Sequence, residues 1–475
     1  MEFNKSRFAL FFGNRGFFPA SLIAQAREEL PRLLKSWGHE VLMLDENATR
    51  YGAVETLQEG QRYANFLREN YGKFDGVILC LPNFGDEYGA VTALKDANVP
   101  IFVQAYPDDL DKMSPAMRRD SFCGKISIMD VFQQYQVRFT ALKPHTVDPK
   151  SATFKENIEY FDRVCRVVGG VKGMVVGAIG ARTTPFKTVR IDEVALQRHA
   201  ITVETLDMSE IIARVKALPA SSDAYKAKKE LLTGYTSWNG VPEVAFESII
   251  KLGVVLDEII ESYQMDAISI RCWSELQLQL GISPCVLMGE LNSRLVSSAC
   301  EVDLGNAVMM HALALASGSP PALLDWNNNY KDEDDKCILF HCGPVPKNLM
   351  TDGGSVVDNP ILATSLGEGC SYGCHVGRIQ PVKFTFGSLM TSDGRVSVYL
   401  GEGKFTTDPV PAEFFGVAGV AQIDRLQDLL LHIGRKGYRH HVALTSNWIQ
   451  EPLREALENY LNFNVEIPNK KFMEK

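Results

Sequence analysis

The sequence predicts an α/β protein with two domains built on doubly wound parallel sheets, followed by a β-rich, barrel-like C-terminal domain. A chain of 475 residues exceeds what one hydrophobic core supports, because single cores stop growing at roughly 250 to 300 residues. Short apolar runs alternate with amphipathic helical segments in two successive parts of the chain, which is typical of βαβ units. Beyond residue 335 the runs are rich in β-branched and aromatic residues and are flanked by turn residues. We therefore expect domains at residues 1–165, 166–335 and 336–475.

The first two domains show the same alternation of predicted strands and helices. In the first, the expected strands are FALFFG, EVLMLD, DGVILCLP and PIFVQAY, and the expected helices are AQAREELPRLLKSW and TLQEGQRYANFLREN. In the second, VKGMVVGAIGAR, ITVETLD and DAISIRCW are expected strands, and FESIIKLGVVLDEIIESYQ is an expected helix. Parallel strands joined by helices place ligand sites at their carboxyl ends.

The third domain is predicted to consist mainly of strands, with two helices near its C-terminal end. VKFTFGSLM and RVSVYLGEG are separated by the turn sequence SDG, which predicts a hairpin. The segment AQIDRLQDLLLHIGRKG predicts a helix that ends at Gly434 or Gly437, followed by the strand HHVALTS and the helix PLREALENYL.

Composition excludes several classes of partner. The formal net charge of -9, with no basic stripe, argues against a nucleic-acid partner. The sequence shows neither a secretory signal nor a run of about 18 apolar residues, so we expect a cytoplasmic protein without a membrane partner. The glycine spacings of GNRGFFP and GAIGAR match neither a phosphate loop nor a dinucleotide fingerprint, which predicts no nucleotide cofactor.

Two carboxylates are candidates for chemistry. Glu301 is expected to open a long apolar helix, and Asp325 follows the apolar run PALL. A carboxylate at a helix start and another at a strand end can converge in a cleft. The alternative for Glu301 is an acid that pairs with the helix dipole, a role for which Asp303 is the natural candidate.

Three histidines could complete a metal site. His341 ends the run CILFH, and His440 and His441 open HHVALTS, where neighbouring side chains point to opposite faces so that only one can face a given site. Each histidine alone is more often a hydrogen-bonded core or surface residue. Together with two carboxylates they form a ligand set for a divalent ion, with Mn²⁺ favoured and Co²⁺, Mg²⁺ and Fe²⁺ also open.

Residues near the expected strand ends are candidates for binding a small sugar. Trp273 and Gln277 follow the strand DAISIR, and a tryptophan there could hold the apolar face of a sugar or pack a domain boundary. Arg15 lies in the loop after the first strand. We also assign Trp326 and Asn447 to substrate binding.

Several segments of the sequence recur in order in a known family. These segments are VVGAIGARTTPF, IRCWSELQ, the PC pair at 284–285, CEVDLGNAVMM, PALLDWNNNY, ILFHCGPVP and GYRHHVAL. With them the chain resembles the L-fucose and L-arabinose isomerase superfamily, most closely its shorter fucose-isomerase-like branch. The resemblance implies two α/β domains plus a β-rich one, and a trimer or hexamer with the active site at a subunit boundary.

The same resemblance implies roles for individual residues. Glu301 and Asp325 would be metal ligands, and one of His440 and His441, with His441 our first choice, would complete the set. His341 occupies a place where arabinose isomerases supply a further histidine ligand and fucose isomerases differ. Arg15 would reach the sugar of a neighbouring subunit.

These residues predict a metal-dependent ketol isomerase. Such an enzyme would interconvert an aldose and a ketose, of the L-fucose or L-arabinose type or a modified sugar such as sulfoquinovose, through an enediol or enediolate. Moving a proton beside a carbonyl needs a positioned carboxylate, and either Glu301 or Asp325 could be the base. A divalent ion would stabilise the developing charge. The alternatives are a non-catalytic sugar-binding protein and a metal-dependent sugar epimerase or aldolase.

Overall fold

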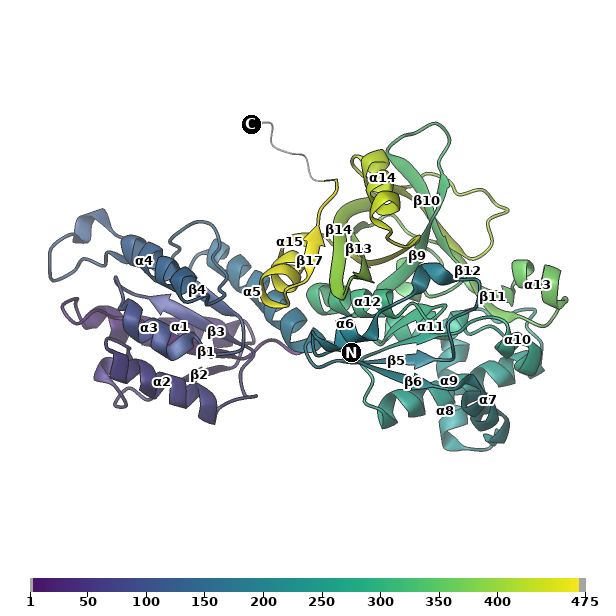
Figure 1. Cartoon of the computed structure of the whole chain (residues 1–475), viewed down its shortest axis with the longest axis horizontal. Coiled ribbons are helices and arrows are strands. Elements are labelled where there is room, and N and C mark those ends of the chain that lie inside the picture. Colours follow the sequence, from purple (N-terminus) through teal and green to yellow (C-terminus); the bar gives the residue numbers. More distant parts are fainter. Residues whose placement is uncertain (1–2, 470–475) are drawn as a thin grey trace. The chain divides into compact units, whose positions relative to one another are not determined.

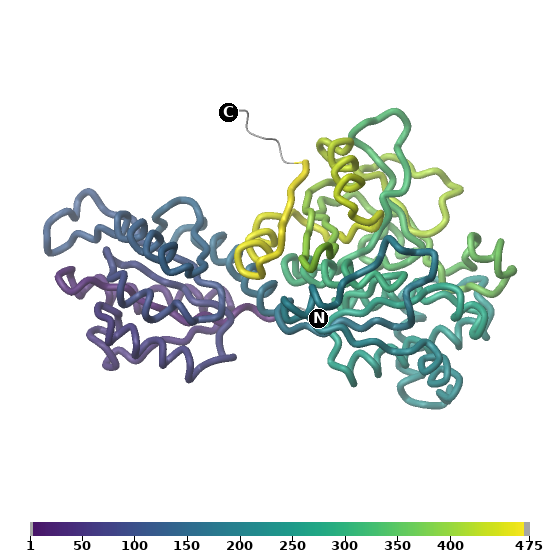
Figure 2. The backbone as a smooth tube through the Cα atoms, viewed as in Figure 1, coloured from purple at the N-terminus to yellow at the C-terminus, as the bar shows by residue number. Residues whose placement is uncertain are grey.

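The computed structural model describes residues 3–469, which divide into two compact units (Figure 2). The N-terminal unit holds residues up to 169 together with the returning segment 455–462. The large unit holds residues 170–454 and the chain from 463 onward. Each unit is described by itself below.

The N-terminal unit is a four-stranded parallel sheet in the order β2-β1-β3-β4 (Figure 1). Every residue of β1 and β3 is buried, as expected for parallel strands covered on both faces. The strands are β1 (Phe8–Phe12), β2 (Val41–Met43), β3 (Gly76–Leu81) and β4 (Ile101–Ala105), and the helices are α1 (Ser21–Ser36), η1 (Arg50–Gly52), α2 (Leu57–Glu69), α3 (Glu87–Leu94), η2 (Leu110–Lys112), α4 (Ser121–Gln134) and, leading into the large unit, α5 (Ala152–Val171).

The large unit begins with a second parallel sheet, in the order β6-β5-β7-β8. Its strands are β5 (Val175–Ile179), β6 (Thr202–Leu206), β7 (Ala267–Ile270) and β8 (Ser297–Cys300), and its helices are η3 (Lys187–Val189), α6 (Glu193–Gln197), α7 (Met208–Ala217), α8 (Asp223–Tyr235), α9 (Glu243–Ser262), α10 (Glu275–Leu280), α11 (Cys285–Ser293) and α12 (Leu304–Ser317). Helix α12 is buried on all sides except at its last residue, and it packs against strands of both sheets of this unit.

The remaining chain forms a nine-stranded mixed sheet in the order β11-β12-β15-β10-β9-β16-β13-β14-β17. An additional pairing of β14 with β15 closes six of these strands, from β15 round to β14, into a barrel. The strands are β9 (Pro321–Asn329), β10 (Lys336–His341), β11 (Ser355–Asp358), β12 (Tyr372–Arg378), β13 (Lys383–Ser392), β14 (Arg395–Phe405), β15 (Val417–Gln422), β16 (His441–Ser446) and β17 (Asn464–Glu466), with η4 (Lys347–Leu349), α13 (Pro360–Leu366), α14 (Leu426–Lys436), α15 (Gln450–Arg454) and the π-helical η5 (Glu455–Tyr460).

The predicted fold class is confirmed: two parallel α/β sheets precede a barrel-like β domain. The helix expected over 421–437 begins at Leu426 and ends before Gly437, whose φ of 80° suits a residue without a side chain. The prediction of a single helix over 452–461 was wrong, because the structure has two segments there, α15 and η5. The boundary between them, at residues 454 and 455, is also where the chain passes from one unit to the other. The boundaries at 165 and 335 stay predictions.

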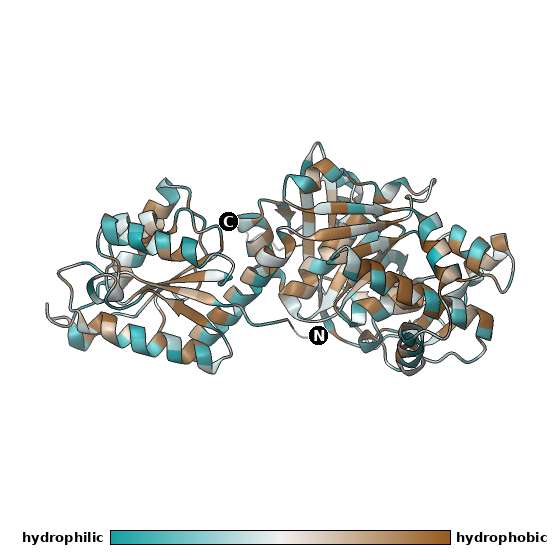
Figure 3. Ribbon diagram, turned by 90° about the horizontal axis from the view of Figure 1, so that it is seen from below, coloured by the Kyte–Doolittle hydropathy of each residue, from teal (hydrophilic) through white to brown (hydrophobic). Residues whose placement is uncertain are grey.

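Hydropathy follows this layering. Figure 3 shows hydrophobic strands within each unit and helices that carry both hydrophilic and hydrophobic stretches. Among residues 3–469 we find no helix whose length and apolar character would let it cross a bilayer.

Candidate metal centre

Glu301 lies on the turn between β8 and α12. Its φ of 56° and that of Val302, 59°, are in the left-handed region, so the chain bends sharply directly after the strand. The expectation that Glu301 opens the helix was wrong, because α12 begins at Leu304 and its cap is Asp303, which accepts a hydrogen bond from the N–H of Asn306. The bend leaves the Glu301 carboxylate free of the cap and places it near the end of β10, the start of β16 and the middle of β9.

Those strands supply the other polar groups of the centre. Asp325 in β9 pairs directly with His441 at the start of β16, so the two side chains share a face of the barrel sheet. Nε2 of His441 lies 3.5 Å from Oδ1 of Asp325 and 3.5 Å from Oε2 of Glu301. His341, the last residue of β10, places Nε2 3.7 Å from the same oxygen of Glu301. The structure thus brings together four residues that lie far apart in the sequence.

Three buried atoms of this cluster are unsatisfied in the described part of the chain, and the two carboxylate oxygens among them suit a bound cation. Glu301 Oε2, Asp325 Oδ1 and His341 Nε2 are buried, and none has a hydrogen-bond partner within residues 3–469. Buried polar atoms without partners are costly, and more than nine in ten are normally satisfied. A divalent ion held by carboxylate oxygens and an imidazole nitrogen would satisfy the carboxylates, so the residues fit a metal site.

Asp303 fixes the state of His441. Its Oδ2 is 2.8 Å from Nδ1 of His441, and its other oxygen forms an ion pair with the buried Arg439. Burial opposes the charged form of Asp303, but Arg439 and His441 outweigh it and hold its pKa at about 2. Because the carboxylate is ionised, Nδ1 of His441 must donate. The neutral ring therefore turns an unprotonated Nε2 toward Glu301 and Asp325, as a metal ligand requires.

His341 presents the opposite tautomer. Its Nδ1 accepts a hydrogen bond of 2.9 Å from the backbone N–H of Cys342, so the proton of the neutral ring is on Nε2. That N–H faces Glu301 and suits donation to an oxygen better than metal ligation. His440 differs again: its side chain is 40% exposed, its Nε2 lies 3.6 Å from Asp325, and desolvation by the surrounding protein lowers its pKa to about 4.

The two carboxylates have different electrostatic environments. Burial opposes the ionisation of Glu301, but the neighbouring imidazoles of His341 and His441 outweigh it and lower the pKa of Glu301. For Asp325 burial prevails and raises the pKa. Two neighbouring carboxylates with opposite shifts are the arrangement from which acid and base roles arise.

An aromatic series leads from the cluster to Trp273. The ring of Phe186 lies 5.3 Å from that of His440, 5.9 Å from that of His441 and 5.8 Å from that of Trp273. The sequence analysis did not select Phe186. The signal for it was its place in the loop after β5, at the carboxyl end of a parallel strand.

Two other predicted site residues, Gln277 and Trp326, make their hydrogen bonds to groups outside this cluster. Gln277 is buried and donates to the Cys272 carbonyl and to Ser283, so its amide supports the turn after β7. Trp326 follows Asp325 in β9 and therefore points to the opposite face, where its Nε1 donates to Tyr399 at 3.1 Å and its ring meets Phe386.

Asn447 is apart from the cluster, and Arg15 belongs to the other compact unit. Asn447 follows the far end of β16, roughly 20 Å along the strand from His441 at about 3.3 Å per residue. Arg15 belongs to the N-terminal unit, where it forms an ion pair with Glu87 and donates to the Gly85 carbonyl at 2.9 Å.

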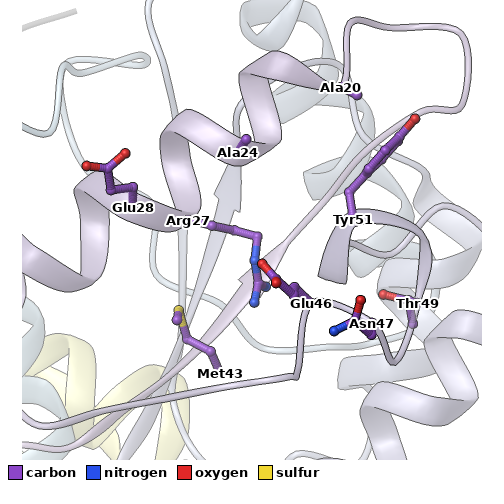
Figure 4. A pocket seen from close by; sticks show the side chains of 9 residues that line it. All are labelled: Ala20, Ala24, Arg27, Glu28, Met43, Glu46, Asn47, Thr49 and Tyr51. Atoms are coloured by element: carbon purple, nitrogen blue, oxygen red, sulfur yellow. The ribbon is translucent and has the colours of Figure 1, made fainter.

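The N-terminal unit has a surface pocket of its own, of about 640 Å³. Figure 4 shows its lining residues: Ala20, Ala24, Arg27, Glu28, Met43, Glu46, Asn47, Thr49 and Tyr51. The Arg27 guanidinium donates to the carbonyls of Gly52 and Leu44, each at 2.8 Å. The lining contains no histidine or cysteine, so its groups differ in kind from those of the metal cluster.

Comparison with known proteins identifies related families and enzymes. Residues 9–172 match the family model "Fucose/sulfoquinovose isomerase, N-terminal domain", and residues 339–468 match "L-fucose isomerase, C-terminal domain". A sulfoquinovose isomerase of Priestia aryabhattai is 22% identical over 422 residues, which cover 87% of this chain and 90% of the relative. A sulfoquinovose isomerase of Alkalicoccus urumqiensis is 22% identical over 397 residues, which cover 82% and 85% of the two chains.

Among solved structures, D-lactate dehydrogenase of Escherichia coli aligns with 66% of this chain and 93% of its own, at 10% identity and a TM-score of 0.16, too low to support an argument. The family matches agree with the observed order of two parallel sheets and a barrel-like β domain. They also confirm the resemblance found in the sequence. The chain is therefore an aldose–ketose isomerase whose N-terminal and C-terminal parts are similar to those of fucose and sulfoquinovose isomerases.

Proposed function

We propose that this protein is a divalent-metal-dependent isomerase that converts an aldose to its ketose through an enediol or enediolate, with sulfoquinovose as the first substrate to test. The observation that carries the proposal is the convergence of Glu301, Asp325 and His441, with two buried carboxylate oxygens that have no hydrogen-bond partner among residues 3–469. The choice of sugar is supported by the name of the matching N-terminal family and of the curated relatives. L-fucose, L-arabinose and D-arabinose are the comparison substrates.

Glu301, Asp325 and His441 would hold the ion, and their oxygen and nitrogen donors favour Mn²⁺. When bound, the ion would supply a Lewis acid that stabilises the negative charge developing on the sugar. The Asp303 carboxylate keeps His441 in the tautomer that leaves Nε2 free. These roles involve a single metal ion.

The protein's own groups would move the proton. Asp325, whose pKa is raised by burial, is the better candidate to take the proton from the carbon beside the carbonyl and return it to the neighbouring carbon. His341 would donate its Nε2–H to a sugar oxygen, because its Nδ1 is occupied by the backbone of Cys342. Trp273 and Phe186 would cover the apolar face of the sugar and limit access of water.

We also propose that the working form is a trimer or hexamer in which Arg15 serves the site of a neighbouring subunit. The support is the family resemblance together with the polar setting of Arg15 after β1, at the carboxyl end of a parallel strand. Light scattering coupled to size exclusion would measure the assembly, and a monomer with full activity would contradict this part of the proposal.

The reaction is tested by NMR of each sugar incubated with Mn²⁺-loaded protein. We expect the ketose to appear, no turnover after chelation, and recovery when Mn²⁺ is returned. An aldose inverted at the carbon beside the carbonyl would indicate an epimerase instead, cleavage fragments an aldolase, and binding without turnover a sugar-binding protein.

The role of Glu301 is tested by Glu301→Gln, which removes the charge and nearly preserves the volume. We expect Mn²⁺ affinity and turnover to fall by more than the roughly 10- to 100-fold that loss of a ligand's supporting partner costs, because the ion would lose one of its own ligands. Glu275→Gln is the matched control, since Glu275 pairs with Arg271 at 2.9 Å on α10 and its side chain is 43% exposed. Wild-type turnover in Glu301→Gln with full metal occupancy would refute the assignment.

A further inference from the structure

Four cysteines lie around the candidate metal centre. Cys300 and Cys342 are the immediate chain neighbours of Glu301 and His341, and Sγ of Cys272 is 3.4 Å from Oε1 of Glu301. The fourth, Cys285, begins helix α11. All of them are free thiols, so their chemistry is available for modification.

One pair of these thiols is in direct contact. The Sγ atoms of Cys285 and Cys342 are 3.6 Å apart. The contact is imposed by the backbone, because a Cβ on Gly343 would lie 2.2 Å from Cβ of Cys285 and 2.8 Å from its carbonyl carbon. Only glycine lets the segment after β10 pass so close to the start of α11. The close approach of the two backbone segments therefore brings the two sulfur atoms near one another.

The two thiols differ in access. Cys342 is partly exposed, whereas Cys285 retains 2% of its surface. A small oxidant would reach Cys342 first, and Cys285 would be the second thiol that closes the bond. This asymmetry is the usual arrangement of an oxidant-sensing cysteine beside its resolving partner.

We propose that Cys285 and Cys342 form an oxidisable dithiol whose disulfide displaces His341 and lowers the activity of the centre. A disulfide needs an S–S distance of about 2.05 Å, so the sulfurs must approach by about 1.5 Å. Cys342 is coupled to His341 twice: its N–H donates to Nδ1 at 2.9 Å, and its Sγ lies 3.5 Å from the same nitrogen. A shift of Cys342 toward α11 therefore moves the imidazole.

The chemistry is balanced with a peroxide as oxidant. The Cys342 sulfur attacks one oxygen of hydrogen peroxide, the O–O bond breaks, and sulfenic acid and water result. The Cys285 sulfur then attacks the sulfenic sulfur, its proton leaves with the hydroxyl as a second water, and the S–S bond forms. A dithiol such as dithiothreitol reverses the reaction by thiol–disulfide exchange.

The bond itself does not depend on the proposed reaction; only its effect on turnover rests on the proposed function. The first test therefore uses mass spectrometry alone. The reduced full-length protein is treated with hydrogen peroxide, its remaining thiols are alkylated, and the digest is mapped. We expect a peptide linked through Cys285 and Cys342, a mass lower by about 2 Da, and reversal by dithiothreitol. A link between Cys300 and Cys342, or peroxidation of Cys342 without any link, would overturn the proposal.

The second test measures the effect on the centre. Oxidised wild-type protein should lose turnover and bind Mn²⁺ about 10-fold more weakly by calorimetry, the lower end of what disturbing a ligand's support costs. Cys285→Ser, with Cys285→Ala as the alternative if the first folds poorly, should keep both after peroxide. Cys370→Ser is the matched control, because Cys370 is a partly exposed thiol of the same unit that bonds the Gly367 carbonyl, and it should stay as sensitive as the wild type. Formation of the link without change in Mn²⁺ affinity or turnover would refute the inhibitory role.

Discussion

Nδ1 of His441 lies 2.8 Å from Oδ2 of Asp303, and both side chains are buried. Asp303 also caps helix α12 and pairs with Arg439, so one carboxylate joins a helix start, a buried cation and an imidazole of the centre. The orientation of His441 is consequently tied to the packing of the barrel against α12.

Replacing Asp303 with Asn should affect both the centre and the fold. The amide can still cap the helix, but it cannot hold a proton on Nδ1 of His441 by charge, so Mn²⁺ affinity should fall about 10- to 100-fold. Arg439 would lose its buried partner, which typically costs about 3 to 5 kcal/mol. Calorimetry and thermal melting measure the two effects. Asp207→Asn is the control, because Asp207 caps α7 through Ser209 and should leave Mn²⁺ affinity unchanged.

The adjacent histidines should differ when each is replaced with Ala. His441→Ala removes the nitrogen that lies 3.5 Å from both carboxylates, so we expect Mn²⁺ binding and turnover to be lost. His440→Ala removes a half-exposed ring and should leave Mn²⁺ affinity close to that of the wild type. Isothermal titration with Mn²⁺ compares the two variants directly. If His440→Ala loses the metal and His441→Ala keeps it, the assignment of the ligand is reversed.

The two tryptophans should separate stability from substrate binding. Trp326→Ala removes a ring that packs on Phe386 and donates to Tyr399, so we expect a loss of stability of about 3 kcal/mol. Trp273→Ala should instead raise KM with a smaller change in melting temperature, because its ring meets Phe186 beside the centre. Melting curves and steady-state kinetics on both variants check this, and an unchanged KM in Trp273→Ala would exclude Trp273 from the sugar site.

Stability should decrease below neutral pH because of His375 in β12. Burial lowers the pKa of His375 to about 4, while in the unfolded chain it is about 6.5. Between these values the unfolded chain binds a proton that the folded protein does not, so stability is full above pH 6.5 and falls as the pH drops toward 4. The loss reaches about 3 kcal/mol.

The measurement is the melting temperature of the protein at pH 7 and pH 5, compared with His375→Asn, which cannot titrate in this range. The variant should start from lower stability, since the ring nitrogen of His375 lies 3.1 Å from Thr236 and 3.2 Å from the Gly353 carbonyl. It should nevertheless lose less stability between the two pH values. An equal pH dependence in both proteins would show that His375 is not responsible.

The sequence by itself determined the fold class and the short list of candidate ligands. Apolar runs separated by amphipathic helices specify parallel sheets locally, and the SDG turn specifies the hairpin of β13 and β14. Glu301 could be chosen because it precedes a long apolar helical run, and Asp325 because it follows the apolar run PALL. These signals come from residues that are close together in the chain, so they can be recognised in the sequence alone.

The tertiary structure alone decided how those residues meet. The register of β9 with β16 sets His441 opposite Asp325, and the alternation of side chains turns Trp326 away from the centre. The ionised Asp303 determines the tautomer of His441, and the Cys342 amide determines that of His341. Cys285 can contact Cys342 only because Gly343, which has no side chain, lets the backbone at Cys285 approach closely. Strand register, the position of the proton on each histidine and close backbone packing all depend on residues that are distant in the chain. The spacing of residues in the sequence therefore cannot predict these three properties.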